Sequence, residues 1–351
     1  MTVLHWFQEL RSGFGDQFFT ICTFVGTQAV LILLFCINYW CIDKNFACEI
    51  GASFFSSSLL VQNLKVTLRI PRPFVRDTTL IPVDSALKGA TGYSFPSGHT
   101  QTAASTLVPA VYEYRRHKVI SVLMCILILL TGISRMYLGV HTPYDVGAAL
   151  GISLLCALAV MILRRRLSES TWYNIILAVI GAVSVFSVIY AVILNSAGDI
   201  ESDQLKDCFK SAGAAAGFSL GVFLERKYAG FAPSAGDTKQ KIIRAAAGFL
   251  NGLFGSGGGI AAVPLLEKNG VEKKKAHAES VALIMVLSAV SAVIYGFKNR
   301  ELFGSELVYI IPAGLVGAGI GAKMMKKMPV RILKKIFGVL LIGAGVRMLW
   351  R

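Results

Sequence analysis

Long runs of apolar residues, separated by short polar segments, make up most of this chain. A helix needs roughly 20 apolar residues to cross a bilayer. Before residue 230, runs of about that length fall at about 18–40, 49–67, 97–114, 119–135, 143–163, 171–195 and 207–225. The pattern therefore predicts an all-α fold, a polytopic membrane helix bundle with about seven spans in this part of the chain.

A polar segment interrupts the apolar pattern after the seventh run. Residues 225–241 read ERKYAGFAPSAGDTKQK, and Pro, Gly and charges in such a mixture mark a domain boundary. The apolar pattern then resumes with a glycine-rich stretch at 242–266 and with runs near 276–297, 306–324 and 331–349. We therefore expect a first membrane domain, a linker and a second membrane domain at 1–230, 231–241 and 242–351.

Basic residues in the short loops predict how the helices are oriented. Residues 112–118 and 164–166 are the basic clusters of the first domain, and clusters of this kind stay in the cytoplasm. This orientation puts 68–96 and 135–143 together on the extracytoplasmic side. The acidic segment 198–203 falls on the same side, which is consistent with the rule.

The glycine-rich stretch 242–266 can be interpreted in two ways. A single crossing would put the basic loops of the second domain outside, against the rule that basic loops stay inside. A broken helical hairpin that enters and returns keeps those loops inside, and residues 255–259 (GSGGG) provide flexible backbone for its turn. We prefer the re-entrant hairpin, followed by about three spans.

Composition agrees with a membrane protein and limits the classes of function. Hydrophobic residues make up 54% of the chain and charged residues 16%, with a net charge of +15. Because no soluble domain remains to hold a nucleic acid, we assign the positive charge to cytoplasmic loops and expect no nucleic-acid partner. We expect no cleavable signal peptide, and the short loops are typical of a multi-pass protein of a bacterial inner membrane.

Residues able to carry chemistry gather in three short stretches on the predicted extracytoplasmic side. Residues 65–73 read KVTLRIPRP, 95–100 read FPSGHT and 134–145 read SRMYLGVHTPYD. Lys65 and Arg72 are seven positions apart, about two helical turns, and should face one side of a helix. The candidate site residues are Lys65, Arg72, Ser97, Gly98, His99, Arg135, His141 and Asp145.

The cations and one expected helix start suit a phosphate group. Three fixed cations match a dianion, because arginine offers a planar fork of donors and lysine a point charge. A helix is expected to begin at Ser97 and Gly98, where free backbone N–H groups also favour an anion. We therefore expect the cations and this helix start to bind a phosphoryl group.

The two histidines can divide the work of a hydrolysis. One attacks phosphorus and forms a phosphohistidine, while the other protonates the leaving oxygen. If Pro143 starts a helix, Asp145 lies one turn after His141 and can orient its ring. We therefore assign His141 as the nucleophile and His99 as the general acid. Nothing in this set requires a metal or another cofactor.

Each residue also has a structural interpretation. Lys65, Arg69 and Arg72 can form a basic belt at the membrane interface. His141 can pack at a helix start, and Asp145 can be a favourable charge at a helix N-terminus. These interpretations remain open one by one, but together they must explain three coincidences on one membrane face.

The three stretches resemble the type 2 phosphatidic acid phosphatase superfamily, whose pattern is K-x6-RP, PSGH and SR-x5-H-x3-D. Every position of the pattern is matched, and the resemblance extends over roughly residues 1–230. It implies an all-helical membrane fold in which His141 is the nucleophile, His99 the acid and Asp145 its relay. It also implies a phosphate-binding role for Lys65, Arg72, Ser97, Gly98 and Arg135.

The resemblance further implies a membrane lipid phosphatase that needs no metal and acts on a phosphate or pyrophosphate monoester. A site at the interface with an apolar approach favours a lipid phosphate over a sugar phosphate. Undecaprenyl pyrophosphate is the favoured substrate, and phosphatidic acid and phosphatidylglycerophosphate remain alternatives. The active site is expected on the extracytoplasmic side of the cell membrane.

The second domain is similar to the sulfite exporter (TauE/SafE-like) family. The resemblance rests on the glycine tract 248–259, the span start at 277–280 and the Pro/Gly span 312–321. That family usually carries two such halves, so transport by this single half would require a homodimer. The alternative function is therefore an anion or lipid-phosphate transporter with a coupled phosphatase domain, and a third possibility is a scaffold that dimerises the phosphatase.

Overall fold

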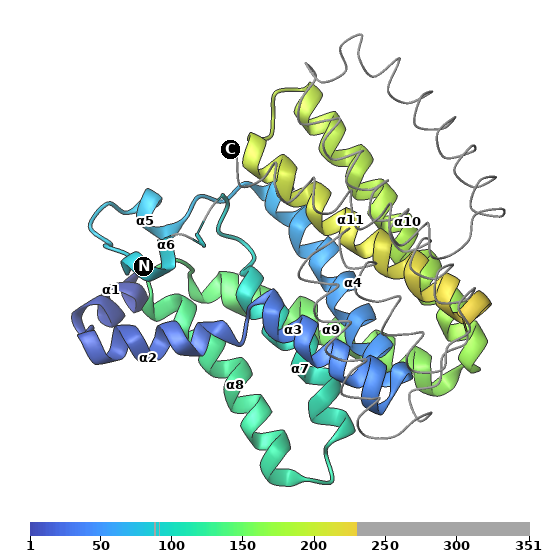
Figure 1. Cartoon of the computed structure of the whole chain (residues 1–351). Coiled ribbons are helices and arrows are strands. Elements are labelled where there is room, and N and C mark those ends of the chain that lie inside the picture. The colour runs from blue at the N-terminus through green and yellow to red at the C-terminus, as the bar shows by residue number, and fades with distance from the viewer. Residues whose placement is uncertain (88, 91, 230–351) are drawn as a thin grey trace, which may run out of the picture. The chain divides into compact units, whose positions relative to one another are not determined.

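The structure, a computed structural model, describes residues 1–87, 89–90 and 92–229. Every regular element in this part of the chain is a helix, in agreement with the apolar pattern (Figure 1). In chain order they are α1 (Thr2–Glu9), α2 (Gly13–Phe24), α3 (Gln28–Ile37), the π-helix η1 (Asn38–Ile42), α4 (Lys44–Leu68), α5 (Pro73–Arg76), α6 (Asp84–Leu87), α7 (Gly98–Glu113), α8 (Lys118–Tyr137), α9 (Pro143–Arg166), α10 (Glu169–Ser196), α11 (Ser202–Leu224) and the π-helix η2 (Glu225–Ala229).

Three helices among the described residues are long and apolar enough to cross a membrane. They are α8, α9 and α10, and the bent pair of α2 and α3 makes a fourth crossing if it acts as one span. The chain is therefore a multi-pass membrane protein. The other expected spans coincide with α4, α7 and α11; α7 is shorter, with 16 residues, and α4 and α11 are long enough but do not combine high hydropathy with few charged residues. The total of about seven spans stays a prediction.

The first expected span, 18–40, is not one continuous helix. It is divided into α2 and α3, which meet at an angle of 43°. At the break, Thr27 adopts an extended conformation at the N-cap position of α3, without a capping hydrogen bond from its side chain. Gly26 lies against the start of α7, where an added Cβ would be 2.5 Å from the carbonyl oxygen of His99. The break therefore places the backbone of this segment directly beside a candidate site residue.

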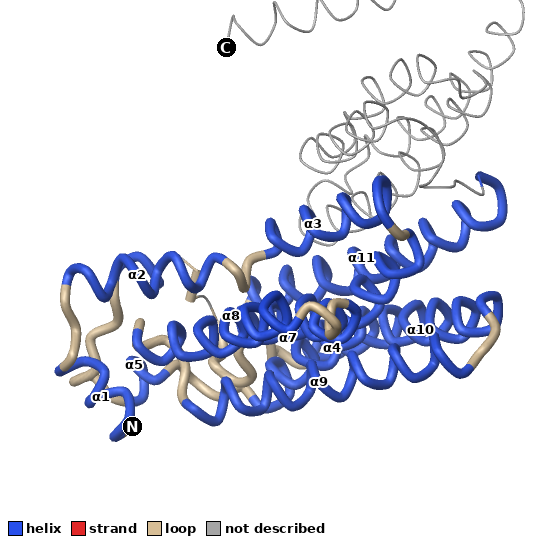
Figure 2. Tube along the Cα trace, turned by 90° about the horizontal axis from the view of Figure 1, so that it is seen from below, coloured by secondary structure: helices blue, strands red, loops and turns tan. Residues whose placement is uncertain are grey.

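Helix α4 lies at the centre of the described bundle and packs against α7, α9, α10 and α11 (Figures 1 and 2). Small residues on α4 are fully buried and permit this close approach, among them Ala47, Ala52 and Ser53. Gly51 faces α11, and a Cβ at this position would be 2.5 Å from the ring of Phe218. This packing fixes the end of α4 that carries Lys65.

The N-terminal helices hold the segment that connects α5 and α6. The His5 side chain contacts the carboxylate of Asp77 at 2.9 Å, and Arg11 donates to the carbonyl oxygen of Ile81. The guanidinium of Arg11 also donates to the carbonyl oxygen of Tyr137 at the end of α8. These contacts join α1 and α2 to the end of the bundle where the candidate residues lie.

The predictions for the second domain lie outside the described residues. They comprise the linker at 231–241, the domain at 242–351, its re-entrant hairpin and its three spans.

Candidate active site

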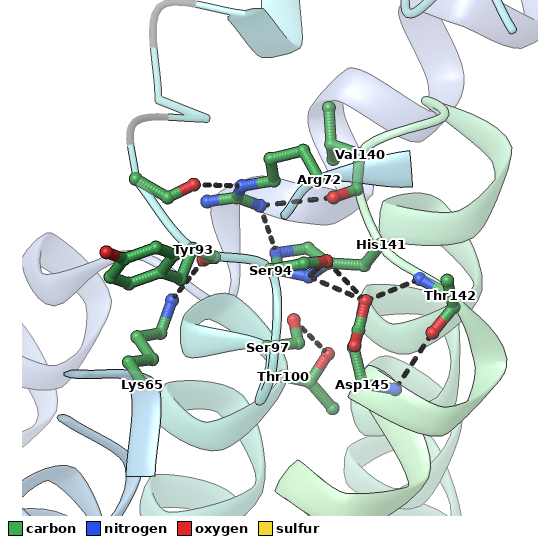
Figure 3. Close-up of polar contacts among 11 residues, drawn as sticks. Lys65, Arg72, Tyr93, Ser94, Ser97, Thr100, Val140, His141, Thr142 and Asp145 are labelled. Atoms are coloured by element: carbon green, nitrogen blue, oxygen red, sulfur yellow. Dashed lines mark hydrogen bonds and ion pairs between the residues drawn. The ribbon is translucent and has the colours of Figure 1, made fainter. Parts of the chain in front are cut away.

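The three sequence stretches meet at one end of the bundle (Figure 3). The structure places Lys65 in the last turn of α4, Arg72 just before α5, Ser97, Gly98 and His99 at the start of α7, Arg135 near the end of α8, and His141 and Asp145 at the start of α9. Hydrogen bonds connect the first stretch to the third and the second to the third.

Lys65 and Arg72 do not belong to one helix, although their spacing predicts that they share a helical face. Helix α4 ends at Leu68, and Arg69 adopts a left-handed conformation with φ of 50°. The expectation that both cations share a helical face is therefore wrong. Both instead donate to the loop before α7: Lys65 Nζ lies 3.2 Å from the carbonyl oxygen of Tyr93, and Arg72 Nε lies 3.0 Å from that of Gly92.

The contact between Arg72 and His141 defines the protonation of the imidazole. Arg72 Nη1 lies 2.8 Å from His141 Nε2, and a guanidinium can only donate. His141 Nε2 therefore accepts, and the ring proton is on Nδ1, which faces Asp145 Oδ2 at 3.5 Å. The lone pair of Nε2 is thus directed toward the cations, which is the geometry that a nucleophile for phosphorus needs.

Burial and positive charge keep His141 neutral. Its side chain is 2% exposed, and burial, followed by the charge of Arg72, lowers the pKa of His141 well below its usual 6.5. Burial also lowers the pKa of Arg72 to about 10, which leaves this guanidinium a cation at neutral pH. The resting site therefore combines a neutral imidazole with a charged guanidinium.

Asp145 lies both at a helix start and beside the imidazole, the two positions that the sequence left open. Pro143 begins α9, as expected, and Thr142 is its N-cap in a capping box with Asp145. In this box the Thr142 backbone nitrogen donates to Asp145 Oδ2 at 2.7 Å. The same oxygen faces His141. The carboxylate therefore takes part in the cap of the helix and also lies 3.5 Å from the imidazole.

Arg135 carries donors that no atom of the described residues accepts. Its side chain is 2% exposed, and Nη1 donates to Thr23 Oγ1 of α2 at 2.9 Å. Its Nε and Nη2 are buried and have no hydrogen-bond partner within the described part of the chain. These two nitrogens form one edge of the guanidinium, which can grip two oxygens of a carboxylate or phosphate. Unpaired buried donors are costly, so this edge is typical of an anion site.

The start of α7 contributes backbone groups. Ser97 is the N-cap, and its backbone nitrogen donates to the carbonyl oxygen of Asp145 at 3.0 Å. Its hydroxyl accepts from Thr100 Oγ1 at 2.9 Å rather than from a backbone N–H. Gly98 and His99 occupy the first turn, where N–H groups lack partners within the helix. His99 is half-buried at this helix start.

Sequence reasoning missed two side chains at the site. Ser94 donates to Asp145 Oδ2 at 2.5 Å, and its place two positions before the PSGH motif was the one available signal. Thr23 accepts from Arg135, and nothing in its apolar surroundings distinguishes it. Among the described residues, no group of three His, Cys, Asp or Glu side chains comes together in a way that could hold a metal ion.

Fold and site define a helical membrane protein with a buried, cation-rich site around an imidazole pair. Residues 46–169 match the family model of the PAP2 superfamily, and this segment contains all eight candidate residues. The match thus covers the segment in which the three motifs were found.

Individual relatives match smaller parts of the chain. A "Probable membrane transporter protein MamO" of Magnetospirillum gryphiswaldense is 28% identical over 131 residues, which are 35% of this chain and 21% of the relative. "Undecaprenyl-diphosphatase BcrC" of Bacillus subtilis is 38% identical over 100 residues, 27% of this chain and 47% of the relative. The chain thus spans less than half the length of these relatives.

One solved structure is also similar. It is the "first transmembrane PAP2 type phosphatidylglycerolphosphate phosphatase from Bacillus subtilis", with 23% identity and a TM-score of 0.40, over 48% of this chain and 85% of that one.

Proposed function

We propose that this protein is an integral membrane lipid phosphatase that hydrolyses a phosphate or diphosphate monoester through a phosphohistidine. The proposal rests on one combination of observations: His141 Nε2 is an acceptor facing Arg72, and one edge of Arg135 has no partner among the described residues. Phosphoryl transfer to histidine requires a neutral imidazole as the nucleophile and cationic donors that bind the phosphate oxygens. The family match of residues 46–169 supports the same reaction class.

In the first step, His141 Nε2 attacks phosphorus and the bond from phosphorus to the leaving oxygen breaks. His99 gives its proton to that oxygen, so the leaving group departs as an alcohol or a phosphate. In the resting site Arg72 donates to Nε2, which is the atom that must bond to phosphorus. During the attack the guanidinium therefore gives up this contact and donates to a phosphate oxygen instead. Lys65 and Arg135 stabilise charge on the remaining oxygens.

In the second step, water attacks the phosphohistidine from the side of His99. The neutral His99 takes a proton from this water, the bond between phosphorus and Nε2 breaks, and inorganic phosphate leaves. The Nδ1 proton of His141 stays beside Asp145, which stabilises the ring while it carries the phosphoryl group. Both histidines then return to their starting states.

We propose undecaprenyl diphosphate as the substrate, in keeping with the name of the Bacillus relative. The site is proposed to face the extracytoplasmic side of the cell membrane. Arg164 and Arg165 at the opposite end of the bundle support this orientation, because basic clusters favour the cytoplasm. We further propose that the first domain ends near residue 230 and that the second serves as a transport or dimerisation module.

A second candidate function is an anion or lipid-phosphate transporter with a coupled phosphatase domain. The match to a probable membrane transporter favours this candidate. Substitution of Gly258 by Leu tests it in the full chain. Loss of flux with hydrolysis intact supports transport, whereas unchanged flux and hydrolysis support a scaffold.

The proposed phosphatase is tested by phosphate release from the purified full chain in detergent. The panel comprises undecaprenyl diphosphate, dioctanoyl phosphatidate and glucose 6-phosphate, each with and without EDTA. We expect the lipids to be cleaved, EDTA to have no effect, and His141→Ala to lower kcat by at least about a thousandfold. Acid-labile label retained from a ³²P-labelled lipid identifies the phosphohistidine. Phosphate release that survives His141→Ala would refute the mechanism.

A further inference from the structure

The carboxylate of Asp145 is shared by three donors at one oxygen (Figure 3). Asp145 Oδ2 lies 2.5 Å from Ser94 Oγ, 2.7 Å from the Thr142 backbone nitrogen and 3.5 Å from His141 Nδ1. The Ser94 contact is the shortest of the three. The hydroxyl therefore contributes directly to where this oxygen lies relative to the imidazole.

Chemistry fixes the direction of the Ser94 hydrogen bond. An ionised carboxylate only accepts, so the hydroxyl hydrogen points to Asp145 Oδ2. Ser94 Oγ also lies 3.5 Å from His141 Nδ1, and this nitrogen carries the ring proton. Ser94, Asp145 and His141 thus form a triangle of polar atoms, and Ser94 is only 1% exposed.

The backbone around Ser94 is itself held from two sides. Its nitrogen donates to the carbonyl oxygen of Ile70 at 2.7 Å. Gly92, two residues earlier, has a φ of +64°, and a Cβ there would overlap the side-chain amide of Gln204 on α11. The carbonyls of Gly92 and Tyr93 accept from the two cations of the first stretch. The loop is therefore a fixed platform on which the hydroxyl has a defined position.

We propose that Ser94 is a positioning residue, whose hydroxyl holds Asp145 Oδ2 beside His141 Nδ1 and so keeps Nε2 directed at the phosphate. The inference rests on the proposed phosphatase function. Ser94 acts through Asp145 and His141, because its hydroxyl is directed at the carboxylate. Its loss should therefore affect kcat and leave KM nearly unchanged.

By donating a hydrogen bond to the carboxylate, the Ser94 hydroxyl also weakens the electrostatic attraction between Asp145 and a protonated His141. Charged and titratable groups reach His141 from every side, and they are Lys65 of α4, Arg72 before α5, His99 of α7, Arg135 of α8 and Asp145 of α9. All of these except Asp145 disfavour the imidazolium. In Ser94→Ala the Thr142 backbone nitrogen still holds Asp145 Oδ2 near the ring, but the carboxylate has lost one hydrogen bond and attracts the imidazolium more strongly. The acidic limb of the rate profile should then move to higher pH.

The test compares Ser94→Ala with Ser153→Ala in the full chain, with dioctanoyl phosphatidate as the substrate. Ser153 is equally buried, but its hydroxyl donates to the carbonyl oxygen of Gln101. For Ser94→Ala we expect kcat to fall about tenfold, KM to stay within about twofold, and the acidic limb to move to higher pH. For Ser153→Ala we expect the wild-type profile. An unshifted limb with wild-type kcat in Ser94→Ala would overturn the proposal.

Ser94→Thr separates positioning from packing, because it keeps a hydroxyl and changes the volume. Recovery of kcat and of the pH profile supports the proposal, even if Ser94→Ala has a lower unfolding temperature. If Ser94→Thr fails like Ser94→Ala and neither profile is shifted, the role is packing and the proposal is wrong. His141→Ala serves as the reference: if it remains active, the proposed function fails. If His141→Ala is inactive but Ser94→Ala keeps the wild-type kcat and pH profile, the positioning role alone fails.

Discussion

Cations gather at both ends of the described bundle, but those where α9 stops are paired with carboxylates, whereas Lys65 and Arg135 at the site end are not. At the end where α9 stops, Arg164 contacts the fully buried Glu49, and Lys44 Nζ lies 3.0 Å from Glu225. At the other end, Lys65 donates to a backbone carbonyl and Arg135 to a threonine hydroxyl. The first end is a set of ion pairs, and the second is a set of cations held by neutral oxygens.

The difference separates structural charge from charge that serves a ligand. A buried cation is costly, and a nearby carboxylate offsets that cost within the protein. Neutral oxygens can orient a cationic side chain without neutralising its charge. The electrostatic field of that charge then remains available to a bound anion. Arg135, with one edge unpaired, is the clearest case. The predictions below test this contrast between the two ends.

The largest effect is expected from substitution of Arg135 by Met. We expect kcat/KM to fall by about a hundredfold to a thousandfold, because the substitution removes a two-point grip on the transferred phosphoryl group. Arg135→Lys should recover only part of this loss, since an ammonium cannot bind two oxygens in parallel. Steady-state phosphate release measures both variants.

The same Arg135→Met variant should unfold at an unchanged or higher temperature in detergent. Met fills similar volume, and two unpaired buried donors are removed. A clear drop in unfolding temperature would mean that Arg135 is structural and that the contrast between the ends is wrong.

The opposite result is expected for Arg164→Met. The substitution leaves Glu49, whose side chain is 0% exposed, without its closest cation. We expect a loss of about 3 kcal/mol in the free energy of unfolding, while kcat of the folded fraction stays unchanged. Arg166→Met is the matched control, because Arg166 is exposed on the same turn, and it should change stability by at most about 0.5 kcal/mol. Equal effects of both variants would contradict the prediction.

Much of the described fold follows from the apolar pattern, and its failures have local causes. Helix α10 (Glu169–Ser196) nearly coincides with the expected span 171–195. The run 18–40 gave no sign of its break, because Gly26 is placed by contact with His99, which is distant in sequence. The spacing of Lys65 and Arg72 predicted a shared helical face, and this prediction failed because the helix ends before Arg69. Pro71 and Pro73, which disfavour helix in the residues before them, could have signalled that exit.

The candidate site was predictable only as far as its motifs. His99, His141 and Asp145 stand out in sequence because their residue types and spacing fit a known chemistry. Ser94 contacts Asp145 and Thr23 contacts Arg135 across the fold, and a serine or threonine has no distinctive chemistry of its own. Their roles are properties of tertiary contact, which a local pattern does not contain.

A smaller effect is expected from Thr23→Val, which removes the neutral oxygen that aims Arg135. The substitution preserves shape but leaves Nη1 without its acceptor. We expect KM for dioctanoyl phosphatidate to rise about tenfold, because a freed guanidinium binds the phosphate less well. Thr20→Val is the control, since Thr20 lies one turn earlier on α2 and contacts Ser85 instead. A wild-type KM for Thr23→Val would show that Arg135 does not depend on this contact.

The smallest effect is expected from moderate acidification. The cations at the site end are not cancelled, so together with burial they lower the pKa of His141 well below 6.5. Because Nε2 must be neutral to attack, a lowered pKa moves the acidic limb of kcat/KM to lower pH. We expect kcat/KM to fall by less than about twofold between pH 7 and pH 5.5, where a histidine of ordinary pKa would lose about tenfold. A tenfold loss over this range, measured under chemistry-limited conditions, would mean that carboxylates offset the cations here as they do at the opposite end.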